Sequence, residues 1–77
     1  MNKPPLRAIL INHNVVVCDS DEDRQMLQDA KSIADDPSAA SNLTIGRLHL
    51  IKDACQRYSL GSLQRLVKMA IDRGGRE

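Results

Sequence analysis

The chain contains one aromatic side chain, that of Tyr58, and neither phenylalanine nor tryptophan in its 77 residues. Its core must therefore be built from the smaller side chains of Leu, Ile, Val, Met and Ala. A domain of this length buries only about 62% of the surface that its unfolded chain exposes. Both limits argue against a two-domain enzyme or a nucleotide-binding α/β domain, and they indicate one small module.

The spacing of the apolar residues predicts a mainly α fold, with a short N-terminal β-hairpin or strand followed by a three-helix body. We expect residues 1–5, which contain Pro4 and Pro5, to form a flexible tail. Residues 6–77 should form a single small domain. Its expected elements are a strand or hairpin at 8–18 and helices at 21–35, 44–58 and 62–73.

The first expected element consists of apolar runs at residues 8–11 and 15–18, separated by Asn12-His13-Asn14. An Asn-rich connector between two such runs is typical of a β-hairpin, although one longer strand fits the same residues. Neither run alternates cleanly with polar residues. We therefore expect both faces to be covered, one by helices and the other by a second copy of the chain.

The expected helix boundaries follow from capping residues. Asp19 or Ser20 can cap the first helix, and acidic residues follow in its first turn, where they suit the helix dipole. Pro37 disfavours helical geometry in the residue before it and so ends this helix. Residues 37–43 read as a loop, with Asn42 or Thr44 capping the next helix.

The second helix is expected to be the central one, because its apolar residues form two stripes. Leu48, Ile51, Cys55 and Tyr58 form one, and Leu50 and Ala54 form the other. The third helix carries apolar residues at helical spacing and ends at the glycines of positions 74 and 75.

Charge is divided along the chain although its net value is only +1, which favours neither nucleic acid nor an anionic membrane as a partner. Residues 19–36 hold seven acids against Arg24 and Lys31, whereas residues 37–77 hold seven bases against three acids. The favoured interpretation is that the two segments pack together and screen one another. The alternative is that each segment offers a face to a different partner.

The two cysteines, Cys18 and Cys55, both lie in apolar surroundings in the sequence. The first residues do not resemble a secretory signal, and no apolar run has the roughly 18 residues of a membrane span. We therefore expect a cytoplasmic protein without membrane association, whose thiols are reduced and buried.

The sequence contains partial matches to three site motifs. Residues 15–24 resemble the first acidic strand end of a response-regulator receiver domain, but nothing after residue 37 supplies its later strands. Asp19, Asp21 and Asp23 match an EF-hand calcium loop, which also needs Gly and Glu where Arg24 and Ala30 stand. His13, Cys18, His49 and Cys55 lack the close ligand pairs of a zinc site. We expect no metal, no cofactor and no catalytic residues.

Residues 51–73 read as a helix, a tight turn and a helix. They resemble a helix-turn-helix DNA-binding unit, with a shorter connector than usual. This resemblance implies a nucleic-acid-binding set of Arg57, Ser62, Gln64, Arg65 and Lys68. Two antiparallel helices joined by a short loop explain the same residues without DNA. A ribbon-helix-helix unit is less favoured, because its strands would have to expose basic residues.

The expected function is that of a small non-enzymatic regulatory or adaptor protein. It would act by binding another protein, and the small aliphatic core favours a homodimer. The alternative is a helix-turn-helix-like transcriptional regulator that binds DNA. The sequence does not identify the residues that contact a protein partner.

Overall fold

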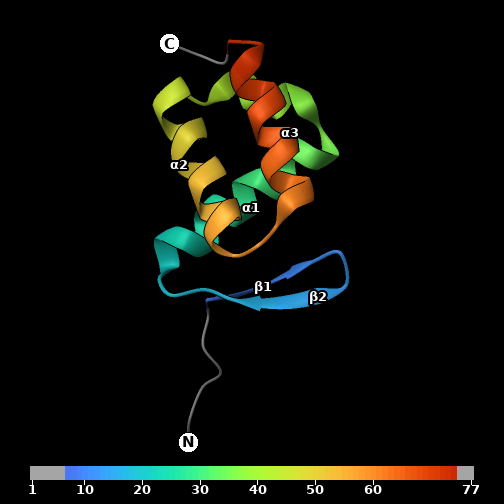
Figure 1. The fold of residues 1–77 in the computed structure, drawn as a ribbon, viewed down its shortest axis with the longest axis vertical. Coiled ribbons are helices and arrows are strands. Elements are labelled where there is room, and N and C mark those ends of the chain that lie inside the picture. The colour runs from blue at the N-terminus through green and yellow to red at the C-terminus, as the bar shows by residue number, and fades with distance from the viewer. Residues whose placement is uncertain (1–6, 75–77) are drawn as a thin grey trace, which may run out of the picture.

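The computed structural model describes residues 7–74 (Figure 1). Its elements are β1 (Ala8–Ile11), β2 (Asn14–Val17), α1 (Asp21–Asp35), the 3₁₀ helix η1 (Pro37–Asn42), α2 (Ile45–Arg57) and α3 (Gly61–Asp72). The prediction of a mainly α fold with an N-terminal hairpin and three helices is confirmed. The expected tail at residues 1–5 lies outside the described residues.

The two strands form an antiparallel hairpin, which decides between the hairpin and the single longer strand. Ile11 pairs with Asn14 next to the turn, and Ala8 pairs with Val17 at the open end. The two turn residues, Asn12 and His13, have φ angles of 51° and 70°. Positive φ at both positions is the geometry of a type I′ turn, whose twist matches that of the flanking strands.

The hairpin has an inner and an outer face. Ile9 and Ile11 are buried in the core on the inner face, which lies against the helices. The outer face carries three exposed aliphatic side chains, those of Leu10, Val15 and Val17. The predicted cover of one face by helices is confirmed for the inner face, whereas the predicted cover of the other face by a second copy stays a prediction. The helices all lie on one side of the sheet (Figure 1).

Helix α1 begins where the sequence predicts, because the hydroxyl of Ser20 accepts a hydrogen bond from the backbone N–H of Asp23. It ends before Pro37, with Asp36 in an extended conformation. The predicted loop at residues 37–43 is wrong in part, because residues 37–42 form η1. Asp36 caps this short helix by accepting from the Ser38 N–H, and proline is well suited to its first position.

Helices α2 and α3 lie side by side and run in opposite directions (Figure 1). Their connection is a Schellman turn: the N–H of Ser59 donates to Gln56 and the N–H of Leu60 donates to Cys55. Ser59 has a φ of 60°, as the residue after the helix end does in this motif. Leu50, assigned to a second buried stripe of α2, is instead 51% exposed.

The acidic and basic segments of the chain pack against each other within one molecule. Helix α1 contacts both α2 and α3. Asp23 pairs with Arg57 at 2.9 Å, and Asp29 pairs with Arg47 at 3.6 Å. Among the helices of residues 7–74, none combines the length and the apolar character needed to span a membrane.

Candidate interaction surface

The largest exposed aliphatic side chains of the hairpin gather on its outer face. Leu10 is 55% exposed, Val15 69% and Val17 64%. Leu10 lies directly opposite Val15 in the strand register, and Val17 lies two residues further along the same face. We call these three residues the outer face. Exposed aliphatic clusters on small proteins are characteristic of interaction sites.

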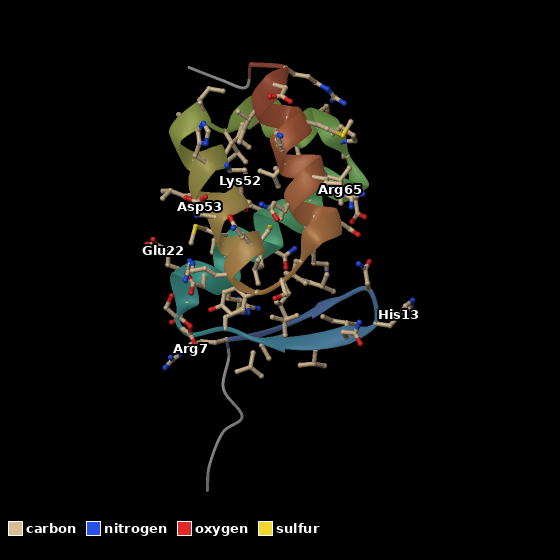
Figure 2. All side chains as sticks on the ribbon, in the orientation of Figure 1. Arg7, His13, Glu22, Lys52, Asp53 and Arg65 are labelled. Atoms are coloured by element: carbon tan, nitrogen blue, oxygen red, sulfur yellow. The ribbon has the colours of Figure 1, made fainter. Side chains whose placement is uncertain are left out.

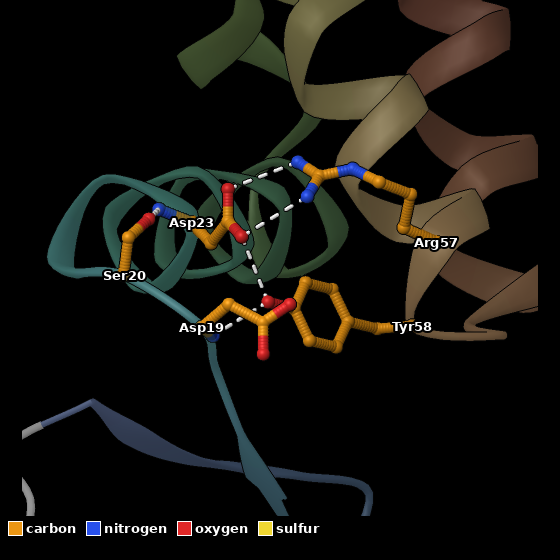
Figure 3. Close-up of polar contacts among 5 residues, drawn as sticks. All are labelled: Asp19, Ser20, Asp23, Arg57 and Tyr58. Carbon is orange, nitrogen blue, oxygen red and sulfur yellow. Dashed lines mark hydrogen bonds and ion pairs between the residues drawn. The ribbon is translucent and has the colours of Figure 1, made fainter.

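A polar cluster anchors the hairpin to the helices (Figure 3). The carboxylate of Asp23 is buried and accepts two hydrogen bonds from Arg57, at 3.1 and 2.9 Å. It also accepts a hydrogen bond of 2.7 Å from the hydroxyl of Tyr58. The same hydroxyl accepts a 2.7 Å bond from the N–H of Asp19, the residue that leads from the hairpin into α1. This cluster joins the segment that follows β2 to the start of α1 and the end of α2.

The electrostatics of the cluster match its geometry. Hydrogen bonds from Arg57, and then from Tyr58, hold the pKa of Asp23 below its usual range. The hydrogen bond to Asp23 raises the pKa of Arg57 in turn. Removal from water is the main cause that raises the pKa of Tyr58. Asp23 and Arg57 are a charged pair stabilised in its ionised form. The hydrogen bonds of the Asp23 carboxylate are made within the cluster.

The residues implied by the helix-turn-helix resemblance do not all share one environment. Ser62, Arg65 and Lys68 are exposed and follow one another at three-residue spacing on α3, and Arg65 points away from the helices (Figure 2). Gln64 is half-buried beside them. Arg57 lies at the end of α2, where both terminal nitrogens of its guanidinium bond to Asp23.

The thiols of Cys18 and Cys55 are free and buried. Burial raises the pKa of the Cys55 thiol to about 11, and burial is also the main cause that raises the pKa of Cys18. A thiol with a raised pKa is a poor nucleophile at neutral pH. No group of three or more His, Cys, Asp or Glu side chains between residues 7 and 74 could hold a metal ion.

Hollows lie beside both ends of α3. One lies between η1 and α3, with Pro37, Ala40, Ala70 and Arg73 among its walls. The other lies between the hairpin turn and the α2–α3 turn and is lined by uncharged residues only. Neither hollow is lined by a carboxylate, a histidine or a thiol that could act in acid–base or nucleophilic chemistry.

No family model matches the chain, and neither a curated protein nor a solved structure is similar to it. Function is therefore inferred from the geometry of the molecule.

Reasoning from the sequence missed two features of this region. A face to be covered by a second copy was predicted, but its residues were missed because the runs Ala8–Ile11 and Val15–Cys18 are apolar at nearly every position. The burial of Asp23 was missed because acids in a first helical turn are usually exposed. The sequence did indicate this burial. Asp23 lies three residues before Met26 and four before Leu27, which is the spacing of one helix face, and both of those residues are buried.

Proposed function

We propose that this chain is a small non-enzymatic regulatory or adaptor protein that binds another protein and does so as a homodimer. The observation that carries the proposal is the outer face. Three aliphatic side chains, each more than half exposed, stand on one side of a sheet whose other side is packed against helices. Covering such a face removes apolar surface from water, which is the main driving force of protein association.

The chemistry of the outer face defines the partner that fits it. Its side chains are aliphatic and uncharged, so the partner should present an aliphatic surface of its own. At the open end of the hairpin, the face is bordered by the Arg7 guanidinium, which donates to the Asp19 carbonyl at 2.8 Å. An apolar centre within a polar rim is the usual anatomy of a protein–protein interface.

The test places a photo-crosslinking amino acid at Val15 and, as the matched control, at Leu50. Both positions are exposed and aliphatic, but Leu50 lies on α2, away from the outer face. Besides a second copy of the chain, crosslinking in cells should capture one other protein from position 15, and this other protein should not be captured from position 50. That protein, purified, should then bind the wild type and lose about tenfold or more in affinity for Val15→Lys, while Leu50→Lys binds normally.

Equal capture from both positions would overturn the proposal. So would a captured protein whose affinity is unchanged by Val15→Lys. Both variants should fold as the wild type does, because the side chains of Val15 and Leu50 lie outside the core.

DNA binding by α3 is the alternative function. The observation that favours it is the exposed row of Ser62, Arg65 and Lys68 on one helix. Its test is a titration of mixed-sequence duplex DNA at low salt, repeated as the salt concentration rises. Binding that weakens steeply with salt and is reduced in Arg65→Ala would favour DNA over the adaptor function. No binding at low salt would exclude the alternative.

A further inference from the structure

We propose that the homodimer forms through β2, which pairs antiparallel with β2 of a second copy so that the two hairpins become one four-stranded sheet. This inference rests on the homodimer of the proposed function and assigns its interface. Two features of the hairpin lead to it: the backbone groups that its own pairing leaves free, and the polar side chains at its two ends.

The pairing within the hairpin determines which backbone groups are free. Arg7 and Cys18 form a hydrogen-bonded pair, because the N–H of Cys18 donates to the Arg7 carbonyl at 3.0 Å. In an antiparallel ladder, hydrogen-bonded pairs alternate with pairs that are not hydrogen-bonded. Ile9 and Val16 are therefore bonded to each other, whereas the N–H and C=O groups of Val15 and Val17 point away from β1.

The two edges of the hairpin differ in what covers them. On the β1 edge, the carbonyl of Ala8 accepts a 3.2 Å hydrogen bond from Arg24 of α1, and α1 packs against β1. On the β2 edge, the free stretch ends at Asp19, whose N–H donates to Tyr58. Between the turn and Asp19, the outward backbone groups of Val15 and Val17 are open. No lysine or proline protects β2, although edge strands commonly carry such residues.

A dimer with its two-fold axis at Val16 lets the free N–H and C=O groups of Val15 and Val17 all form hydrogen bonds. In that register, Val15 of each copy lies opposite Val17 of the other, and each such pair exchanges both of its N–H···O=C bonds. The two copies use the same residues in both directions, as a two-fold interface requires. The axis itself passes between the two Val16 residues, whose side chains lie on the inner side with the helices.

The polar side chains at the ends of the hairpin agree with this register. Counting outward from the axis places His13 of one copy opposite Asp19 of the second copy. Figure 2 shows His13 at the turn end of the hairpin, and Arg7 and Glu22 at the other end. The acidic start of α1 therefore approaches a partner turn that carries an imidazole and no acid. An imidazole can donate a hydrogen bond to a carboxylate in either protonation state.

The paired hairpins also join their outer faces. Residues directly opposite each other in adjacent strands lie on the same side of a sheet, so the outer faces of both copies combine into one surface twice as large. The dimer thus presents the surface that the proposed protein partner binds.

The experiment measures the dimer dissociation constant by sedimentation equilibrium. Val17→Pro removes an outward N–H and breaks no hydrogen bond within the chain, because proline is tolerated where an edge N–H faces solvent. We expect it to raise the dissociation constant about tenfold or more, through loss of hydrogen bonds across the axis. The matched control is Leu10→Pro, which removes an outward N–H from the β1 edge and should leave the dimer intact. Circular dichroism checks that both variants are folded.

A second variant tests the register without altering a strand. His13→Asp places a carboxylate opposite Asp19 of the second copy and should weaken the dimer, and adding Asp19→Lys should restore it. Aspartate tolerates the positive φ of position 13. A dimer that survives both Val17→Pro and His13→Asp, or is lost in Leu10→Pro, overturns this interface and leaves the homodimer standing. A monomeric wild type overturns the homodimer itself, while the crosslinking test of the outer face remains separate.

Discussion

The guanidinium of Arg57 meets the carboxylate of Asp23 through two hydrogen bonds, with distances of 3.1 Å (Nη1–Oδ2) and 2.9 Å (Nη2–Oδ1). Asp23 stands in the first turn of α1 and Arg57 is the last residue of α2. Since Tyr58 binds both Asp23 and the N–H of Asp19, the contact joins two helices to the end of the hairpin. This arrangement makes the stability of the fold depend on one buried carboxylate.

Asp23→Ala should lower the free energy of unfolding by about 2 kcal/mol, because it removes three hydrogen bonds to a charged acceptor. Part of the loss is offset, since Arg57 is half-exposed and regains water. Urea denaturation followed by circular dichroism measures the change. Asp29→Ala is the matched control: its pair with Arg47 is longer, at 3.6 Å, and partly exposed. A surface pair of that kind contributes about 0.5 kcal/mol or less. Equal losses in the two variants would contradict the role given to Asp23.

Stability should also fall in acid because of Asp23. Hydrogen bonds from Arg57 and Tyr58 lower its pKa in the folded protein, so near the unfolded pKa of about 3.9 the unfolded chain binds more protons. The stabilisation is fully present above about pH 5 and is lost as the pH falls through the folded pKa. Thermal unfolding at a series of pH values should show a smaller decline for Asp23→Asn than for the wild type. A decline in Asp23→Asn as large as in the wild type would disprove the assignment.

The sequence was most informative where a local residue determines the local structure. Ser20 and Pro37 bracket α1, and Thr44 caps α2 by accepting from the N–H of Arg47, so the helices could be predicted closely. Asn12-His13-Asn14 favoured the hairpin turn and left one longer strand open, and the strand pairing decides for the hairpin. In each case the determining contact lies within a few residues of the boundary that it sets.

The polar cluster and the outer face depend on contacts between distant parts of the chain. Asp23 and Arg57 are 34 residues apart, and nothing near either residue shows that they meet. The outer face depends on which side of the hairpin the helices cover, and this is decided by packing rather than by the strands. Apolar residues on both sides of β1 and β2 therefore gave no basis for choosing the exposed one.

Ser59→Gly should raise the free energy of unfolding by about 0.5–1 kcal/mol, because glycine adopts a positive φ without the steric cost of a Cβ atom. Ser59 has a φ of 60° at the end of α2, where glycine is the usual residue of this turn. Chemical denaturation measures the gain. The control is Ser62→Gly in the first turn of α3, where the backbone is helical and glycine should give no gain. A loss of stability in Ser59→Gly would show that the serine side chain contributes more than its strain costs.

His13→Gly should change the stability of one chain and the stability of the dimer in opposite directions. His13 has a φ of 70° in the hairpin turn, at a position where glycine is the usual residue of a type I′ turn. Glycine there should raise the free energy of unfolding of the monomer by about 0.5–1 kcal/mol by relieving that conformation. The same change removes the imidazole that lies opposite Asp19 of the second copy, so the dimer dissociation constant should rise.

Asn12→Gly is the control for this pair of effects, because Asn12 has a φ of 51° in the same turn but lies outside the proposed contact. It should leave the dimer dissociation constant unchanged, and its stability gain should be smaller because asparagine tolerates this conformation well. Unfolding is measured at concentrations below the dissociation constant, and dimerisation by sedimentation equilibrium. If His13→Gly stabilises the monomer and leaves the dimer as tight as the wild type, His13 has no part in the interface. If His13→Gly weakens the dimer while Asn12→Gly does not, His13 contributes to the dimer interface although it destabilises the turn of its own chain.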